Sequence, residues 1–124
     1  ELLTKSDYVS LHLPLTENNK EFINERSIQK MKPNAVLINT ARGGLINEND
    51  LAKALNNGII RGAALDVLST EPPSKSNLLL KAKNCLITPH IAWGSYEARK
   101  KLLEIVVENI KAYQQGSPIN VVNN

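Results

Sequence analysis

Residues 35–58 read AVLINTARGGLINENDLAKALNNG, and their pattern is the clearest indication of the fold class. Ala35–Asn39 is a short apolar run without polar alternation, a pattern typical of a strand buried in a parallel sheet. Residues 42–44 contain two glycines and predict a tight turn. Asn47 can cap a following helix, which has acidic residues in its first turn and ends at Gly58. The stretch therefore predicts a strand, a turn and a helix in succession.

The same alternation continues on both sides of this stretch. Strands are predicted at Tyr8–Leu13, within Ile59–Val67 and at Cys85–Thr88, and further helices from Asn24 to Met31 and from Ser95 to about Gln115. Leu2 and Leu3 read as the end of a short helix, and Ser69–Lys83 is expected to be mostly loop. Alternating strands and helices predict an α/β fold with a largely parallel sheet.

The organisation changes near Gly94. Before this residue the predicted elements are short, whereas after it one long helix has its apolar residues at helical spacing. These residues are Leu102, Leu103, Val106, Ile110 and Tyr113. Gly116 and Pro118 end the helix. We therefore expect two parts, residues 1–94 and residues 95–124.

The composition excludes several classes of function. The chain has 124 residues, of which 42% are hydrophobic, enough for one small domain with a core. The net charge of +3, scattered basic residues and few aromatics argue against a nucleic-acid partner. The single cysteine, Cys85, fits a reducing, cytoplasmic setting. No apolar stretch is long enough to predict a membrane span, and the opening residues do not predict a signal peptide.

Polar residues follow three of the apolar runs: Arg42 after AVLINTA, Glu71 after GAALDVLST, and His90 after CLITP. In a parallel sheet, ligands bind outside the carboxyl ends of the strands. Arg42 has a fork of donors that matches a carboxylate, and His90 can give or take a proton near neutral pH. If Glu71 lies against His90, its negative charge favours the protonated ring. Taken alone, each residue has a plainer interpretation: a surface arginine, a packed histidine and a solvated glutamate.

Asp66 lies near the end of an otherwise apolar strand, where a carboxylate is costly unless it has a partner. It accepts a hydrogen bond either from within the fold or from an amide group of a ligand. His12 and Cys85 are expected to serve packing, and the basic run Arg99–Lys101 to form a solvated helix face. The sequence has no metal-ligand spacing and no Gly-x-Ser-x-Gly element, so neither a metal site nor a serine hydrolase is predicted.

Taken together, these segments resemble the D-isomer-specific 2-hydroxyacid dehydrogenases. The matching motifs, in the family's order, are SDYVSLHLPLT (6–16), MKPNAVLINTARGGLIN (31–47), GAALDVLSTEPP (62–73), ITPHIAWGS (87–95) and ENIKAYQQGSPINVV (108–122). The Pro-His-Ile-Ala-Trp form is most similar to the glycerate dehydrogenase (hydroxypyruvate reductase) branch. The resemblance implies a two-domain, homodimeric enzyme that binds NAD across a Rossmann-type sheet and acts on a small 2-keto or D-2-hydroxy acid.

The resemblance also implies catalytic roles. Arg42 would clamp the substrate carboxylate and polarise the keto oxygen. His90 would be the general acid for reduction and the base for oxidation, and Glu71 would orient His90 and keep it protonated. Trp93 would help to shape the substrate pocket around Arg42 and His90.

The implied cofactor contacts form a second set. Asp66 would accept a hydrogen bond from the nicotinamide carboxamide, with Arg42 and His90 facing the same end of the cofactor. Thr40 and Ala41 would line the nicotinamide side. Leu13 and Pro14 would lie near the adenosine side. NADP is not excluded, because the ribose-binding acid that distinguishes the two cofactors has no match in this sequence.

One departure from the family is large: no Gly-x-Gly-x-x-Gly fingerprint occurs in this sequence. We therefore expect a C-terminal fragment. Residues 1–94 would be the second half of the NAD-binding domain, and residues 95–124 a helix and tail that return to the substrate domain. The isolated chain is expected to bind NADH poorly and to show no turnover, because the helix N-terminus that holds the pyrophosphate is missing. Two alternatives remain: a non-enzymatic, corepressor-like member that senses the dinucleotide, and an interaction module without a ligand.

Overall fold

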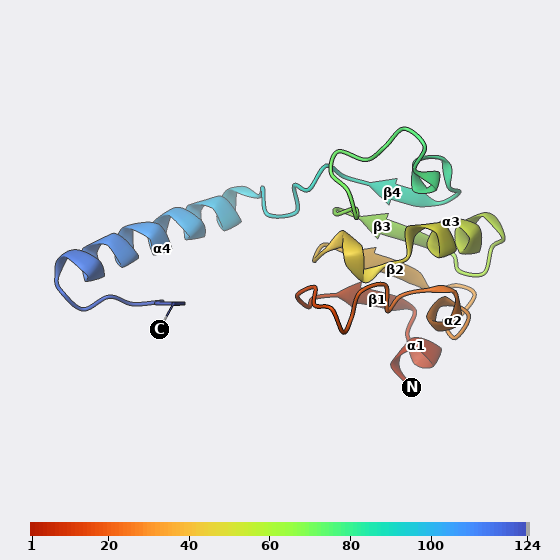
Figure 1. Cartoon of the computed structure of the whole chain (residues 1–124), viewed down its shortest axis with the longest axis horizontal. Helices are drawn as coiled ribbons and strands as arrows, with labels where there is room; N and C mark the ends of the chain where they lie inside the picture. The colour runs from red at the N-terminus through yellow and green to blue at the C-terminus, as the bar shows by residue number, and fades with distance from the viewer. Residues whose placement is uncertain (124) are drawn as a thin grey trace. The chain divides into compact units, whose positions relative to one another are not determined.

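A four-stranded parallel sheet forms the framework of the computed structural model, which describes residues 1–123 (Figure 1). Its strands are β1 (Tyr8–Leu11), β2 (Val36–Asn39), β3 (Gly62–Leu65) and β4 (Cys85–Ile87). They lie side by side in the order of the chain, and every neighbouring pair is parallel. The carboxyl ends of all four strands therefore lie at one edge of the sheet. The predicted α/β fold with a parallel sheet is confirmed.

Helices follow the strands as the sequence predicted. They are α1 (Leu2–Lys5), α2 (Glu25–Ile28), α3 (Glu48–Asn56) and α4 (Tyr96–Gln114), with short 3-10 helices η1 (Gly43–Leu45) and η2 (Leu78–Lys81). Asn47 caps α3, because its side-chain oxygen accepts a hydrogen bond from the Asp50 amide at 3.0 Å. Asn24 caps α2 in the same way through the Ser27 amide. The predicted cap at Asn47 and the predicted helix start at Asn24 are confirmed.

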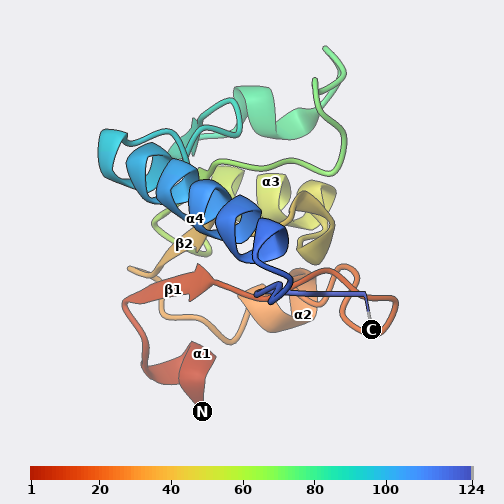
Figure 2. The ribbon, with the colours of Figure 1, turned by 90° about the vertical axis from the view of Figure 1, so that its left-hand side faces the viewer.

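The core lies between one face of the sheet and the helices α2 and α3. Along β1 the residues alternate between exposed and buried, and the strand register places the buried Val9 beside Leu37, which in turn lies beside Ala63. Four residues of α3 pack into the same core. Figure 2 shows α2 and α3 on one side of the strands. Apolar burial on this face therefore fixes the position of the strand ends.

Several predicted boundaries were wrong. The strand predicted to Leu13 ends at Leu11, because its last ladder partner, Asn39, is also the last residue of β2. The helix predicted to reach Met31 is a single turn that ends at Ile28. Residues 69–83 are mostly loop, as predicted, with one short helix, η2, which begins where the Asn77 side chain accepts a hydrogen bond from the Leu79 amide.

The packing role predicted for His12 was also wrong. Its side chain is exposed, and its Nε2 lies 2.7 Å from the Ser10 hydroxyl oxygen. A histidine at this position needs no apolar contact because it is solvated and bonded to Ser10, a residue of the strand that ends just before it. Cys85 agrees better with the prediction, since it is half-buried against the core.

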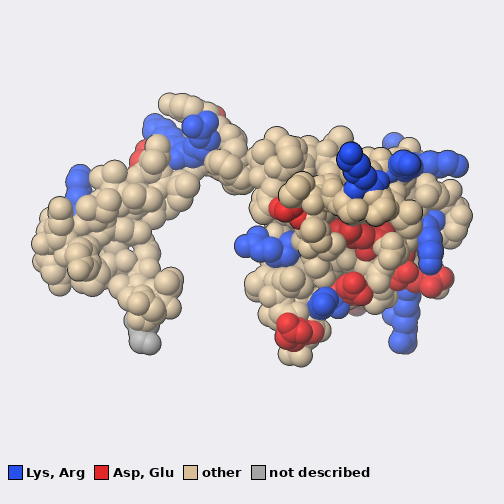
Figure 3. Space-filling model, turned by 45° about the horizontal axis from the view of Figure 1, so that its top comes forward, with Lys and Arg blue, Asp and Glu red and all other residues tan. Residues whose placement is uncertain are grey.

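The chain divides into two compact units, Glu1–His90 and a second that begins at Ile91. In the second unit Ser95 caps α4 through the Ala98 amide, and the helix gives way to Gly116 at a φ of +73°. No helix in the described part of the chain is long and apolar enough to cross a membrane. On the face of the first unit seen in Figure 3, acidic and basic side chains are interspersed.

Candidate active site

Main-chain hydrogen bonds tie together the carboxyl ends of β2, β3 and β4. The Asp66 amide donates to the Asn39 carbonyl at 2.9 Å, and the His90 amide donates to the Asp66 carbonyl at 2.9 Å. Arg42 begins the turn after β2, and Glu71 lies in the loop after β3. The residues predicted from strand ends therefore share one edge of the sheet.

The Glu71 carboxylate and the His90 ring are in direct contact. His90 Nδ1 lies 2.7 Å from Glu71 Oε2, while Glu71 Oε1 accepts a hydrogen bond from the Leu68 amide at 2.9 Å. The two side chains keep 47% and 37% of their surface exposed, His90 and Glu71 respectively. His90 is held in this contact with a backbone φ of +54°, a left-handed conformation that histidine adopts more readily than most residues.

The hydrogen bond from His90 is the main cause of a lowered pKa for Glu71, and the bond from the Leu68 amide adds to it. Desolvation and the nearby charge of Asp66 act in the opposite direction but are outweighed. Glu71 is therefore ionised at neutral pH. Its carboxylate accepts a hydrogen bond from the N–H at Nδ1 of His90. This fixes the orientation of the ring and places Nε2 on the side opposite Glu71.

Replacing Glu71 by glutamine will change how stability depends on pH. Because folding lowers the pKa of Glu71, its stabilisation is fully present above the ordinary value of 4.5 and is lost as pH falls through the lowered value. The wild-type protein should therefore exceed Glu71→Gln in unfolding free energy at neutral pH, and the difference should shrink below pH 4.5. Urea unfolding followed by circular dichroism at a series of pH values measures this.

Glu17→Gln is the control for this experiment, since Glu17 is exposed in the loop after β1. That variant should follow the wild-type stability closely across the series. A Glu71→Gln difference that stays constant down to the lowest pH would contradict the assignment of the stabilisation to the ionised carboxylate.

Asp66 is buried, with 5% of its surface exposed, and has a partner within the fold. The Thr88 hydroxyl donates a short hydrogen bond to Asp66 Oδ1. Both residues line a pocket of about 390 Å³ together with Glu71 and His90. Apolar side chains from the loops after β3 and β4 complete this pocket. A partly apolar pocket with a few convergent polar groups is the usual form of a small-molecule site.

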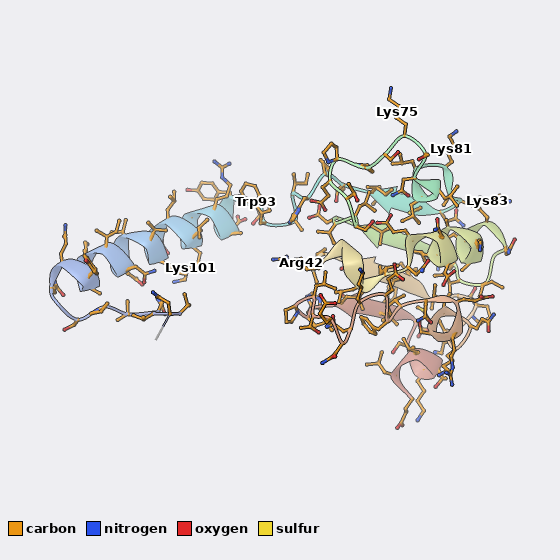
Figure 4. The ribbon with its side chains drawn as sticks, in the orientation of Figure 1. Arg42, Lys75, Lys81, Lys83, Trp93 and Lys101 are labelled. Carbon is orange, nitrogen blue, oxygen red and sulfur yellow. The ribbon has the colours of Figure 1, made fainter. Side chains whose placement is uncertain are left out.

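Arg42 is exposed and projects beyond the end of β2 (Figure 4). Its Nη1 donates to the carbonyl of Ala41 at 2.7 Å. Thr40 is exposed and Ala41 half-buried on the same turn, next to the loop that contains Glu71. Among the described residues, this turn lies outside the lining of the 390 Å³ pocket.

Gly43 allows the Arg42 turn to pack directly against the loop after β3. A Cβ at Gly43 would lie 1.9 Å from the Leu68 carbonyl carbon and 2.4 Å from the Ser69 amide nitrogen. Both contacts are with backbone, so neither can be relieved by a rotamer change. The two loops that hold Arg42 and Glu71 are therefore in main-chain contact only because residue 43 is glycine.

Gly43→Ala should lower the unfolding free energy by about 1–3 kcal/mol, the usual cost of overpacking a close contact. It should also separate the loop that holds Arg42 from the loop that holds Glu71. Gly44→Ala is the matched control, since its added Cβ would meet only the flexible Leu15 side chain at 2.7 Å. Thermal unfolding of both variants measures the difference, and equal losses of stability would contradict this account.

The remaining predicted residues do not line the pocket that contains Asp66, Glu71 and His90. Leu13 and Pro14 follow β1 at the same edge of the sheet, with Leu13 packed against the core and Pro14 exposed. Trp93 belongs to the second unit, where 59% of its surface is exposed. Its contribution to a substrate pocket stays a prediction.

Three polar residues near the site were not singled out from the sequence: Asn39, Thr88 and Glu48. Thr88 lies in the Thr-Pro-His motif, and Asn39 ends an apolar strand, so the half-buried Thr88 and the buried Asn39 could both have been noticed as polar candidates. Glu48 accepts hydrogen bonds from the Ser69 amide at 2.6 Å and the Asn77 side chain at 2.7 Å. It tethers the loop that contains Glu71, a contact that no local pattern indicates.

A parallel sheet with polar residues at its carboxyl edge defines the α/β class of nucleotide-binding domains. Residues 1–92 match the family model described as D-isomer specific 2-hydroxyacid dehydrogenase, NAD binding domain, and the chain belongs to this family. The predictions of family and of an NAD-binding domain are therefore confirmed. No cluster of three or more potential metal ligands occurs among residues 1–123.

Two curated relatives match almost the whole chain. A hydroxypyruvate reductase of Blautia hydrogenotrophica is 50% identical over 123 residues, covering 99% of this chain and 38% of the relative. A glycerate dehydrogenase of Methylorubrum extorquens is 47% identical, covering 98% of the chain and 39% of the relative. The chain thus spans less than half the length of the relatives it matches.

Solved structures show the same fold. An acyclic imino acid reductase in complex with NADPH and D-Arg superimposes with a TM-score of 0.87 at 42% identity, covering 98% of this chain and 38% of that one. A D-isomer specific 2-hydroxyacid dehydrogenase of Lactobacillus delbrueckii ssp. bulgaricus, in its NAD complex, gives 0.86 at 34% identity, covering 97% and 41%.

Proposed function

We propose that this chain provides the acid–base residues of an NAD(P)-dependent enzyme that reduces a small 2-keto acid to a D-2-hydroxy acid. The observation that supports this most is the 2.7 Å contact between Glu71 and His90 at the carboxyl edge of the sheet. The names of the two curated relatives favour hydroxypyruvate and D-glycerate as the substrate pair.

In the proposed reaction, the substrate carboxylate binds the guanidinium of Arg42, which also draws electron density toward the keto oxygen. As the carbonyl carbon gains a hydride, its C=O π bond breaks toward oxygen. His90 Nε2 gives its proton to that oxygen, and Glu71 stabilises the protonated ring through Nδ1. In the reverse direction His90 takes the proton back. Trp93 borders the substrate in this proposal.

The residues at this edge fit the nicotinamide end of the cofactor, which supplies the hydride when bound. Asp66 is a buried carboxylate on the pocket wall, and a carboxylate is a suitable acceptor for a carboxamide N–H. In this proposal Thr40 and Ala41 line the nicotinamide side of the cofactor, and Leu13 and Pro14 lie near its adenosine. NAD is our choice, and NADP is the alternative to be tested.

The sequence has no glycine fingerprint for the pyrophosphate. We therefore propose that residues 1–94 form the second half of an NAD-binding domain in a longer protein. In the same proposal, residues 95–124 return to its substrate domain. The longer protein would be a cytoplasmic homodimer, which sedimentation of that protein would test.

The direct test is to assay the full-length protein with NADH or NADPH and with hydroxypyruvate, glyoxylate or pyruvate. We expect turnover with NADH and a preference for hydroxypyruvate, with D-glycerate as product. NADH binding without turnover of any 2-keto acid would favour the corepressor-like alternative. The isolated 124-residue chain should show no turnover, and measurable hydroxypyruvate reduction by it would refute the fragment proposal.

A further inference from the structure

We propose that Asn39 is a positioning residue that fixes the turn from which Arg42 acts. This inference rests on the proposed function, since it concerns the residue proposed to clamp the substrate. Asn39 is the last residue of β2 and has no exposed surface. Its side-chain oxygen accepts a hydrogen bond from the Ala41 amide at 3.0 Å, and its side-chain nitrogen donates to the Arg42 carbonyl at 2.9 Å.

These two bonds hold the backbone on both sides of the peptide that joins Ala41 to Arg42. The side chains of Thr40 and Arg42 are exposed, so apolar packing around them does little to fix the turn. A buried amide that lost either bond would leave a desolvated polar group, at a considerable cost in free energy. The buried Asn39 side chain therefore holds the start of the turn, while the Gly43 contact holds its end.

The chemistry at this position requires both a donor and an acceptor on one short side chain. Aspartate would place a carboxylate oxygen where the amide nitrogen of Asn39 now lies. That oxygen could not donate a hydrogen bond to the Arg42 carbonyl. Serine and alanine are too short to reach both backbone groups. Asparagine satisfies the Ala41 amide and the Arg42 carbonyl together.

Asn39 also connects the Arg42 turn with the acid–base residue. Its main-chain carbonyl accepts the Asp66 amide at 2.9 Å, and the Asp66 carbonyl accepts the His90 amide at 2.9 Å. The Asn39 side chain thus fixes the backbone at Arg42 relative to the strand ends that also position His90. A shift of about 1 Å in such a group is enough to cost on the order of 100-fold in rate.

The test is a double-mutant cycle on kcat/KM for hydroxypyruvate in the full-length enzyme. Asn39→Ala should lower kcat/KM at least about tenfold in the presence of Arg42. In an Arg42→Ala background the same change should have little further effect, because the guanidinium it positions is gone. Equal losses in both backgrounds would show a general structural role and overturn the proposal.

Asn24→Ala is the matched control. Asn24 also accepts a bond from one backbone amide, that of Ser27, and donates to one carbonyl, that of Glu21, but it caps α2. It should lower the melting temperature without changing kcat/KM. A loss of kcat/KM with Asn24→Ala as large as that with Asn39→Ala would also overturn the proposal.

Two further measurements keep the inference testable if Asn39→Ala does not fold. Asn39→Ser retains a polar group and should show the same dependence on Arg42. In the unmodified protein, the Ala41 amide should exchange slowly with solvent, and rapid exchange would overturn the inference. If Arg42→Ala retained full activity, the proposed role of Arg42 would fail as well, whereas additivity in the cycle alone would reject only the role of Asn39.

Discussion

Replacing His90 with glutamine should lower kcat for 2-keto-acid reduction by roughly 10²- to 10⁴-fold, the usual contribution of a positioned general acid. Glutamine is close in size to the imidazole and keeps a polar group near the position of Nε2. It has no group that transfers a proton to the keto oxygen. Steady-state kinetics with the full-length enzyme, NADH and hydroxypyruvate measure the loss.

His12→Gln is the matched control, because His12 is exposed just after β1 and is bonded to Ser10. It should leave kcat within about twofold of wild type, the range usual for surface substitutions. If His90→Gln kept wild-type kcat, the acid–base role would be wrong, and the module without a ligand or the corepressor-like alternative would be favoured.

Arg42→Lys should lower kcat/KM by roughly 10²- to 10³-fold, the loss expected when a transition-state donor is removed. Lysine keeps the charge but has a single ammonium group, which cannot match a carboxylate with two parallel donors. We expect KM to rise as well as kcat to fall, because Arg42 is proposed both to bind the substrate carboxylate and to polarise the keto oxygen. Rates measured over a wide range of hydroxypyruvate concentration separate the two effects.

Arg61→Lys is the control for Arg42. Arg61 is also exposed, but it lies just before β3, at the amino end of the strand. Its substitution should leave both kinetic constants close to wild type. An Arg42→Lys enzyme with unchanged KM and kcat would contradict the clamp, whatever the result for His90.

The elements of the fold that depend on local sequence were predictable. Asn47 followed by acidic residues identified the start of α3, and the apolar runs identified all four strands. The ends of elements were less predictable, because Leu11 stops pairing only where β2 stops. The end of β1 is therefore set by its partner Asn39, which lies 28 residues further along the chain, and not by the residues that follow Leu11.

In the candidate site, too, the features set by local sequence were predictable and those set by distant partners were not. Arg42, Asp66, Glu71 and His90 were predicted to share an edge, since parallel strands place their carboxyl ends together. Contacts between distant segments were not predictable. The Glu48 carboxylate reaches the Ser69 amide across 21 positions of sequence, and neither neighbourhood contains a signal for it.

The main-chain bonds from Asp66 to Asn39 and from His90 to Asp66 have a consequence for changing this protein. Amide and carbonyl groups belong to every residue type other than proline, so the spacing of the three strand ends does not depend on which side chains occupy them. Designers who wish to alter the pocket can therefore vary its apolar wall while main-chain bonds keep the ends of β2, β3 and β4 in place, provided that Asn39 and Gly43 are retained.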